Sequence, residues 1–460
     1  MRSNLSSLFF GLMILVLAGT GCKKDPAVII DPPDPGPEQY GTPFDQVPAT
    51  ADVVMYEVNP RVFSSTRDLA GIMARLDSIH ALGVNVVWLM PIYRTGSDRS
   101  VGSPYAVRDY GAIHSDYGTL TDLRQLVDKA HSLGMAVMLD WVANHTAWDH
   151  AWISNPGWYA QDANGDIIIP PGTNWQDVAE LNYGNSEMRQ EMIKAMKYWV
   201  LVANVDGYRC DYASGVPADF WAQAIDTLRN IPGRDLLMFA ESDDKTLFDA
   251  GFDLIFGWPY YGQLWQVFNN GVSAKQLYFS HHNTYSGILE GQEVVRWITN
   301  HDQHAWEATP EATFNGTDGA LAAFVLASHM GGAPLIYNGQ EVSVTQQLPF
   351  FESANVTINW NLHPEVKAAY RQIIDYRQQQ PALRGGALAD YSTADLAIFR
   401  RQKGTDEVLV LVNVRDQAVT VDLPAGLVNT SWVDAYQGTA VDLGTTVSLE
   451  GYGYWVLEGT

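Results

Sequence analysis

Cysteine is scarce in this sequence. Of its 460 residues only Cys22 and Cys210 are cysteines. Cys22 directly follows an apolar leader, so the mature chain is not expected to contain an internal disulfide. Small secreted domains often depend on disulfides for stability. This chain must instead be stabilised by packing, and its length is sufficient for a large core.

Basic residues are also few. Lys and Arg total 28 against 52 Asp and Glu, which gives a formal net charge of −24. Such a surface repels nucleic acid and suits a neutral or cationic partner. Aromatic residues are abundant by contrast, with 15 Trp and 22 Tyr. Core packing accounts for most of them, but flat amphipathic rings also stack on sugar faces.

The N-terminal apolar run, "LFFGLMILVLAG", is too short for a permanent membrane span. It follows Arg2 and ends in "AGTGCKKD", which resembles a bacterial lipoprotein signal with Cys22 as the lipidated residue. Gly19 stands where such signals usually have Leu, so an ordinary signal peptide is the alternative. Residues 1–22 are therefore predicted to be a signal peptide. We expect export to the cell envelope and a lipid anchor on a bacterial membrane, at the outer membrane or cell surface.

Residues 23–48 are rich in proline and read as a semi-rigid tether. From residue 49 to 382, short apolar runs alternate with helical patterns. Near-continuous apolar strands separated by helices indicate a parallel sheet covered on both faces, and eight of them indicate a closed (β/α)8 barrel. The eight runs are "ADVVMYEV", "VNVVWLM", "MAVMLD", "NVDGYRCD", "LLMFAE", "DLIFGW", "VVRWIT" and "APLIY".

Two further segments depart from this alternation. Residues 145–184 are irregular and follow the third predicted strand. They are therefore predicted to form an inserted subdomain at the C-terminal end of the barrel strands, where barrel enzymes have their active sites. Residues 383–460 show short alternating strands, which predict a C-terminal antiparallel β-sandwich.

Four carboxylates end the predicted barrel strands or follow them closely. A charged residue at the end of an apolar strand is costly to bury unless it is paired. The mouth of a barrel would bring these carboxylates around one cavity, and two converging carboxylates are the minimum requirement for glycoside hydrolysis. The four are Asp140, Asp211, Glu241 and Asp302.

Their neighbours suggest different roles. Arg209 projects to the same face of its strand as Asp211. The two residues form either a structural ion pair or a nucleophile that the neighbouring cation keeps ionised. Glu241 follows a run of apolar residues, which favours its protonated form and suits a general acid.

Seven segments together carry a resemblance to the α-amylase family of retaining α-glucan-active glycosidases. In order, they are "GVNVVWLMP", "SPYAVRDYG", "DWVANH", "GYRCD", Glu241 after its strand, "NHD" and "GAPLIYNGQE". The similarity runs from about residue 50 to the end. It implies a neutral α-glucan as substrate, and we expect no nucleic-acid partner and a monomer.

The resemblance assigns roles residue by residue. It implies that Asp211 is the nucleophile, Glu241 the acid and then base, and Asp302 the residue that holds sugar hydroxyls in the transition state. Asp140 is expected to serve the scaffold. The implied substrate-binding residues are Arg209, His145, His301 and Tyr105.

A structural Ca²⁺ is a further possibility that the resemblance leaves open. Asn144 matches a residue that often ligates Ca²⁺ in the family. The inserted segment offers hard oxygen donors in Asp177 and in "DANGD", residues 162–166. These do not align with the family's remaining ligands, and "DANGD" also reads as a simple turn.

Two departures bear on specificity. Ala106 stands where exo-acting relatives often carry an Asp, which favours an open, endo-acting cleft. Ser214 and Gly215 replace the Lys and His of many typical α-amylases. The leading hypothesis is an endo-acting hydrolase of starch or maltooligosaccharides. A transglycosylase or neopullulanase-like enzyme is the alternative, and a non-catalytic carbohydrate-binding protein is disfavoured because Asp211, Glu241 and Asp302 are all present.

Overall fold

The computed structural model describes residues 36–349, 351 and 356–459. The predicted signal peptide, Cys22 and the first part of the predicted tether lie outside these residues. No helix in the described part of the chain is both long and apolar enough to cross a membrane.

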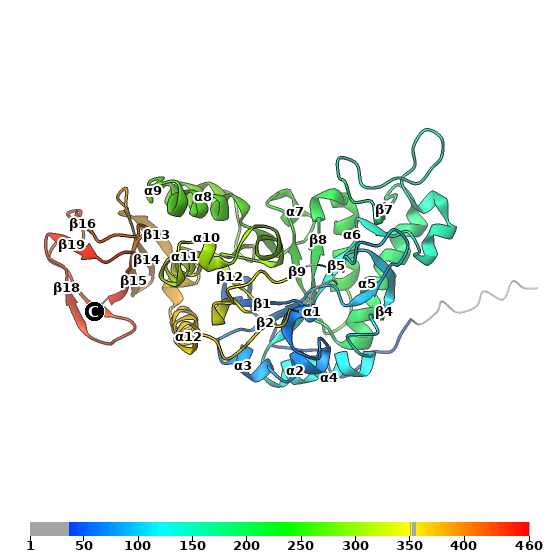
Figure 1. Ribbon diagram of the computed structural model, residues 1–460, viewed down its shortest axis with the longest axis horizontal. Coiled ribbons are helices and arrows are strands. Elements are labelled where there is room, and N and C mark those ends of the chain that lie inside the picture. Colours follow the sequence, from blue (N-terminus) through cyan, green and yellow to red (C-terminus); the bar gives the residue numbers. More distant parts are fainter. Residues whose placement is uncertain (1–35, 350, 352–355, 460) are drawn as a thin grey trace, which may run out of the picture. The chain divides into compact units, whose positions relative to one another are not determined.

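Eight parallel strands close into a barrel, which confirms the predicted fold class (Figure 1). Around the barrel, β1 pairs with β2 on one side and with β12 on the other. Every residue of β1 is buried, as expected for a strand covered on both faces. The barrel strands are β1 (Met55–Val58), β2 (Val86–Leu89), β5 (Ala136–Val142), β8 (Gly207–Asp211), β9 (Leu237–Ala240), β10 (Leu254–Phe256), β11 (Glu293–Arg296) and β12 (Ala333–Tyr337).

Helices surround the barrel and bury their apolar stripes against it. In α4, Thr119 accepts a hydrogen bond from the N–H of Asp122, whose side chain in turn accepts from the N–H of Thr119, so a capping box starts the helix. The longer helices are α4 (Leu120–Ser132), α5 (Ser186–Ala203), α6 (Ala218–Arg229), α8 (Trp258–Asn269), α9 (Lys275–Tyr285), α11 (Thr317–His329) and α12 (Pro364–Gln379). Shorter ones are α1 (Pro60–Phe63), α2 (Leu69–Met73), α3 (Leu76–His80), α7 (Thr246–Asp249) and α10 (Pro310–Thr313).

The second half of the predicted tether is part of the folded body. Tyr40 donates its N–H to Leu201 O at 2.7 Å, and the buried Phe44 stacks on His131 with ring centroids 4.3 Å apart. The prolines suggested an extended spacer up to residue 48. The segment is indeed without helix or strand, but its aromatic residues fix it to the outside of the barrel.

Two antiparallel strand pairs lie outside the barrel sheet, in segments that follow the C-terminal ends of barrel strands. The first is β3 (Tyr93–Thr95) with β4 (Val107–Ile113), and the second is β6 (His145–Ala147) with β7 (Val178–Glu180). The β6–β7 pair spans the predicted insertion, with two short 3₁₀ turns between its strands.

The C-terminal segment forms two antiparallel sheets around a core of their own. Leu411 of β15 and Leu449 of β19 belong to this second hydrophobic cluster. The larger sheet has the order β13-β14-β15-β20-β17-β18, and β16 pairs with β19. The strands are β13 (Ala387–Asp390), β14 (Leu396–Lys403), β15 (Asp406–Asn413), β16 (Val419–Asp422), β17 (Ser431–Asp434), β18 (Ala440–Asp442), β19 (Thr446–Leu449) and β20 (Tyr454–Gly459).

Candidate active site

A cavity of about 770 Å³ opens at the C-terminal ends of the barrel strands. Three of the four singled-out carboxylates line it: Asp211 at the end of β8, Glu241 just after β9, and Asp302 in the segment after β11. His145, His301 and Tyr105 line it as well. The structure therefore brings these six predicted site residues to one cavity, with Arg209 and Asp140 buried beneath.

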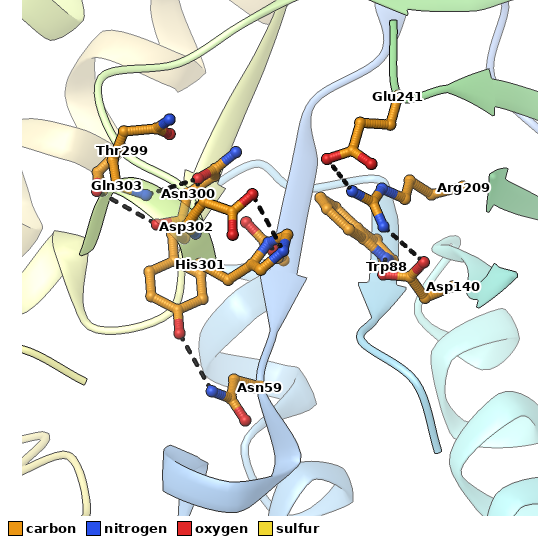
Figure 2. Close-up of polar contacts among 12 residues, drawn as sticks. Asn59, Trp88, Asp140, Arg209, Glu241, Thr299, Asn300, His301, Asp302 and Gln303 are labelled. Atoms are coloured by element: carbon orange, nitrogen blue, oxygen red, sulfur yellow. Dashed lines mark hydrogen bonds and ion pairs between the residues drawn. The ribbon is translucent and has the colours of Figure 1, made fainter. Parts of the chain in front are cut away.

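Arg209 joins the carboxylates. Its Nη1 lies 2.7 Å from Asp140 Oδ1 and 3.0 Å from Asp211 Oδ1, and its Nη2 lies 2.6 Å from Glu241 Oε1. Figure 2 shows its guanidinium between Asp140 and Glu241. The Arg209 side chain is completely buried. Arg209 therefore fits both interpretations, the structural ion pair and the support of a nucleophile. Its guanidinium holds the scaffold carboxylate Asp140 and also contacts both members of the candidate catalytic pair.

Burial, and not Arg209, dominates the protonation of this pair. Burial, together with the charges of Asp140 and Asp302, raises the pKa of Asp211 to about 6 against the lowering influence of Arg209. Burial likewise raises the pKa of Glu241 to about 7, assisted by Asp211 and Asp302. The sequence suggested that Arg209 would keep Asp211 ionised, but that cation is shared among three carboxylates. Glu241 is still the member that holds its proton longer, which is the order a general acid requires.

His301 is held between two carboxylates. Its Nδ1 lies 2.5 Å from Glu57 Oε1, and its Nε2 lies 3.6 Å from Asp302 Oδ2. Burial alone would lower the pKa of His301, but Asp302 and Glu57 outweigh it and raise the pKa to about 9. His301 is therefore an imidazolium at neutral pH. Its Nε2 also lies 3.0 Å from Tyr105 Oη, the tyrosine predicted as a sugar platform.

Glu57 was missed by sequence reasoning. It is fully buried in β1, inside the run "ADVVMYEV", where a carboxylate needs a partner as much as Asp140 does. That signal was available from the sequence. Its partner was not, because His301 lies 244 residues further along the chain.

Asp140 is buried beneath the floor of the cavity. Its Oδ2 accepts from Tyr105 Oη at 3.1 Å and from Trp88 Nε1 at 3.2 Å, in addition to the Arg209 contact. Burial raises its pKa to about 6. These bonds orient Tyr105 and Arg209, which is a supporting arrangement.

Tyr212 contacts Glu241 through its backbone. The N–H of Tyr212 donates to Glu241 Oε2 at 2.7 Å, and Tyr212 adopts a left-handed conformation with φ 42°. Gly215 leaves room for the Tyr212 ring, because a Cβ at that position would lie 2.3 Å from Tyr212 Cε1. Trp175 meets the exposed Tyr212 ring edge to face, with centroids 5.4 Å apart. Ser214 and the paired rings of Tyr212 and Trp175 therefore line the same cavity as Glu241.

Trp306 is another lining residue that the sequence did not reveal. It lies on a single π-helical turn, Gln303–Glu307, that directly follows Asp302, and its side chain is 59% exposed. Its ring lies 5.4 Å from that of Phe351. Short π-turns occur frequently at functional sites, but no sequence pattern predicted one here.

His145 is neutral, since burial lowers its pKa to about 4. Asn144, the predicted calcium ligand, is buried beside it, with its Nδ2 3.4 Å from His145 Nδ1. In "DANGD", Asp162 Oδ1 accepts the N–H groups of Asn164 and Asp166, as in an ordinary turn. Within the described residues no group of three or more His, Cys, Asp or Glu could hold a metal ion. The calcium ion therefore stays a prediction, and no step below uses it.

Comparisons with known proteins agree with this geometry. The model of the α-amylase catalytic domain matches residues 57–171. The chain is 27% identical to α-amylase MalA of Haloarcula japonica over 445 residues, which covers 89% of this chain and 62% of that protein. A crystal structure of an α-amylase from Lactobacillus plantarum superposes with a TM-score of 0.80 at 26% identity, covering 89% of this chain and 99% of the other. In sequence and in fold, the chain is therefore similar to the α-amylase family.

The similarity is not limited to one kind of α-amylase. A maltogenic α-amylase AmyB from Thermotoga neapolitana superposes with a TM-score of 0.79 at 25% identity, covering 89% of this chain and 99% of that one. Shorter matches include a probable oligo-1,6-glucosidase of Bacillus subtilis, 32% identical over 198 residues, or 35% of this chain and 34% of that protein. The chain thus spans about three fifths of the length of the first α-amylase relative and a third of the glucosidase, so activity and substrate have to be argued from the site.

Proposed function

We propose that this protein is an endo-acting α-glucan hydrolase that cleaves starch or maltooligosaccharides with retention of anomeric configuration. The observation that carries the proposal is the contact of one guanidinium, Arg209, with both Asp211 and Glu241. Retaining glycosidases hold their two carboxyl groups only about 5 to 5.5 Å apart, whereas inverting enzymes leave room for a water. A shared guanidinium supports the short separation.

In the first step, Asp211 attacks the anomeric carbon while the bond to the leaving oxygen breaks. Glu241 gives its proton to that oxygen, which departs as a hydroxyl, and a glycosyl ester forms on Asp211. The raised pKa of Glu241 supplies this proton near neutral pH. His301 and Asp302 line the cavity where they can hold the sugar hydroxyls as positive charge develops on the ring.

In the second step, water attacks the same carbon from the face that the leaving group vacated. Glu241, now a carboxylate, accepts the proton of the water, and the bond to Asp211 breaks. Both residues return to their starting protonation states. Two inversions at one carbon give a product with the α configuration.

The endo action is supported by what surrounds the cavity. Ala106 packs with Ala147 and Val178, so no carboxylate stands at that position to close the cleft on a chain end. The exposed aromatic side chains Tyr212 and Trp306 line the opening. Rings of this kind stack on successive sugars, as binding along a chain requires. Export and anchoring through Cys22 are part of the same proposal, and they rest on the N-terminal sequence alone.

Two substitutions test the catalytic assignment. Asp211→Asn removes the nucleophile and Glu241→Gln removes the proton donor, so each should reduce turnover of soluble starch by at least about 10³-fold with thermal melting largely unchanged. Asp219→Asn, an exposed carboxylate on α6, is the matched control and should retain full activity. Near-normal turnover in either active-site variant would contradict the assignment.

The products report the rest of the proposal. Proton NMR should show the α anomer first, and an initial β anomer would exclude the retaining mechanism. Amylose should yield a mixture of intermediate lengths, whereas release of one short product from the outset would indicate exo or maltogenic action. New linkages among the products would indicate transglycosylation. Parallel assays on pullulan and isomaltooligosaccharides report the preferred linkage.

A further inference from the structure

A second cavity, of about 550 Å³, lies apart from the active site. It is bounded by the β3–β4 hairpin, the segment after β6 and helix α5, and the two cavities have no lining residue in common. The residues that carry the argument are Arg108, Asp149, His150, Trp152, Lys194 and Tyr198.

The charges around this cavity balance. Its cations are Arg94, Arg108 and Lys194, and its carboxylates are Asp109, Asp149 and Glu191. Arg108 Nε lies 3.5 Å from Asp149 Oδ2. Lys194 Nζ lies 3.6 Å from Glu191 Oε1. In a protein with a net charge of −24, such a balanced patch favours neither an anion nor a cation. Its paired donors and acceptors suit the hydroxyls of a neutral ligand.

His150 and Trp152 supply a buried donor beside an aromatic ring. His150 is only 6% exposed, and burial lowers its pKa to about 4, so its ring is neutral at pH 7. Its Nδ1 accepts the N–H of Trp152 at 3.1 Å, which leaves the ring hydrogen on Nε2. The two ring centroids are 4.7 Å apart, and Tyr198 adds a second aromatic side chain from α5. Aromatic rings with hydrogen-bonding groups at their edges are suited to sugars.

We propose that this cavity is a second binding site for α-glucan, an inference that rests on the proposed function. The connection between the two sites supports it. His145 lines the active-site cavity, and Asp149 to Trp152, which begin four residues later, line the second cavity. A polymer bound at both places gains from the high effective concentration of the tethered part, whereas a short oligosaccharide cannot reach both. The second cavity therefore strengthens binding of long chains only.

The test uses the Glu241→Gln protein, which should not consume the polymer, in gels containing soluble starch. Trp152→Ala removes the ring, and Ala151→Arg fills the cavity from an exposed position that lines it. Each added substitution should raise the apparent Kd for starch, measured from the retardation, about ten-fold. This corresponds to a loss of about 1.4 kcal/mol in binding free energy. The matched control is Trp265→Ala, a part-exposed residue of α8 that lines neither cavity, and it should leave retardation unchanged.

Activity separates the two proposals. In the protein with Glu241 intact, both cavity variants should hydrolyse a short chromogenic maltoside at the parent rate, within about two-fold. If Ala151→Arg retains the parent's retardation by starch, the second site is refuted while the proposed function stands. If the parent hydrolyses neither substrate, the proposed function fails. Should Trp152→Ala unfold, as reported by circular dichroism, Ala151→Arg decides alone, because Ala151 is exposed.

Discussion

At the scale of single residues, the mechanism proposed above depends on two protons. Asp211 must have lost its proton to attack, and burial raises its pKa to about 6. Glu241 must keep its proton to donate it, and its pKa is raised to about 7. Below about pH 6 the nucleophile is protonated, and above about pH 7 the acid is ionised. We expect kcat/KM on maltooligosaccharides to show a bell-shaped dependence on pH, with its maximum between these two values. The apparent pKa values of the two limbs describe the Asp211–Glu241 pair and not either residue alone. A maximum above pH 8 would contradict this.

A second prediction concerns Glu57. Glu57→Gln keeps an acceptor for His301 Nδ1 but removes the negative charge, so the pKa of His301 should fall from about 9 into the assay range. Asp302 still favours the imidazolium, while burial and Arg209 oppose it. The ratio of variant to wild-type kcat/KM should therefore decline as the pH rises from 6 to 8.5. Taking this ratio removes the titration of Glu241, which is common to both proteins.

The control for Glu57 is another buried glutamate. Glu341 accepts a hydrogen bond from Tyr56 Oη at 2.7 Å and another from the Gly339 N–H at 3.1 Å, and His301 is not among its partners in the described part of the chain. Glu341→Gln should give a ratio that does not change with pH, whatever its absolute activity. A flat ratio for Glu57→Gln as well would assign Glu57 a purely structural role.

At the scale of elements, the turn after β8 contacts Glu241, the proposed proton donor. Gly215→Ala would place a methyl group 2.3 Å from Tyr212 Cε1 and 2.8 Å from Asn144 Oδ1. The Tyr212 ring must then shift, which strains the turn and weakens the bond from the Tyr212 N–H to Glu241 Oε2. Hydrogen bonds to charged groups contribute about 1.5 to 3 kcal/mol, so kcat should fall about ten-fold or more. The alkaline limb should also move to higher pH, because that bond lowers the pKa of Glu241.

Another glycine provides the control for this substitution. Gly262 lies inside α8, and a Cβ there meets nothing within 4 Å. Gly262→Ala should leave kcat unchanged and stabilise the protein by about 0.5 to 1 kcal/mol, since alanine is the better helix former. An unchanged kcat in Gly215→Ala, measured on the same substrate, would mean that the turn does not orient Glu241.

The pattern of apolar residues predicted the helices and strands well, because apolar residues mark the positions that are buried. Each of the eight apolar runs overlaps one barrel strand, and Asp211, Glu241 and Asp302 lie at or beyond the ends of three of these strands, around one cavity. What the sequence could not supply were pairings between distant segments. The contact of Glu57 with His301, and the sharing of Arg209 among three carboxylates, depend on neighbours in space. The docking of residues 40–48 was hidden for the same reason, since local proline content indicates only an extended chain.

At the scale of the whole molecule, Arg401 joins the C-terminal sheets to the barrel. This residue of β14 is 4% exposed, and its Nη1 donates to Met330 O at 2.6 Å and its Nε to Ala382 O at 3.3 Å. Met330 directly follows α11, so the two bonds hold the sheet against the barrel's helices. Arg401→Met preserves length and apolar contact but leaves both carbonyls without these donors.

We expect Arg401→Met to lower the free energy of unfolding by about 2 to 4 kcal/mol, because each buried group left unsatisfied costs about 1 to 3 kcal/mol. Urea denaturation followed by tryptophan fluorescence measures this. Its neighbour Arg400 points to the other face of the strand, where it pairs with the partly exposed Glu407 at 2.8 Å. Arg400→Met should cost less than about 1 kcal/mol, as surface pairs do. Equal losses in the two variants would show that the stabilisation comes from charge on the strand and not from the bonds that Arg401 makes to the barrel.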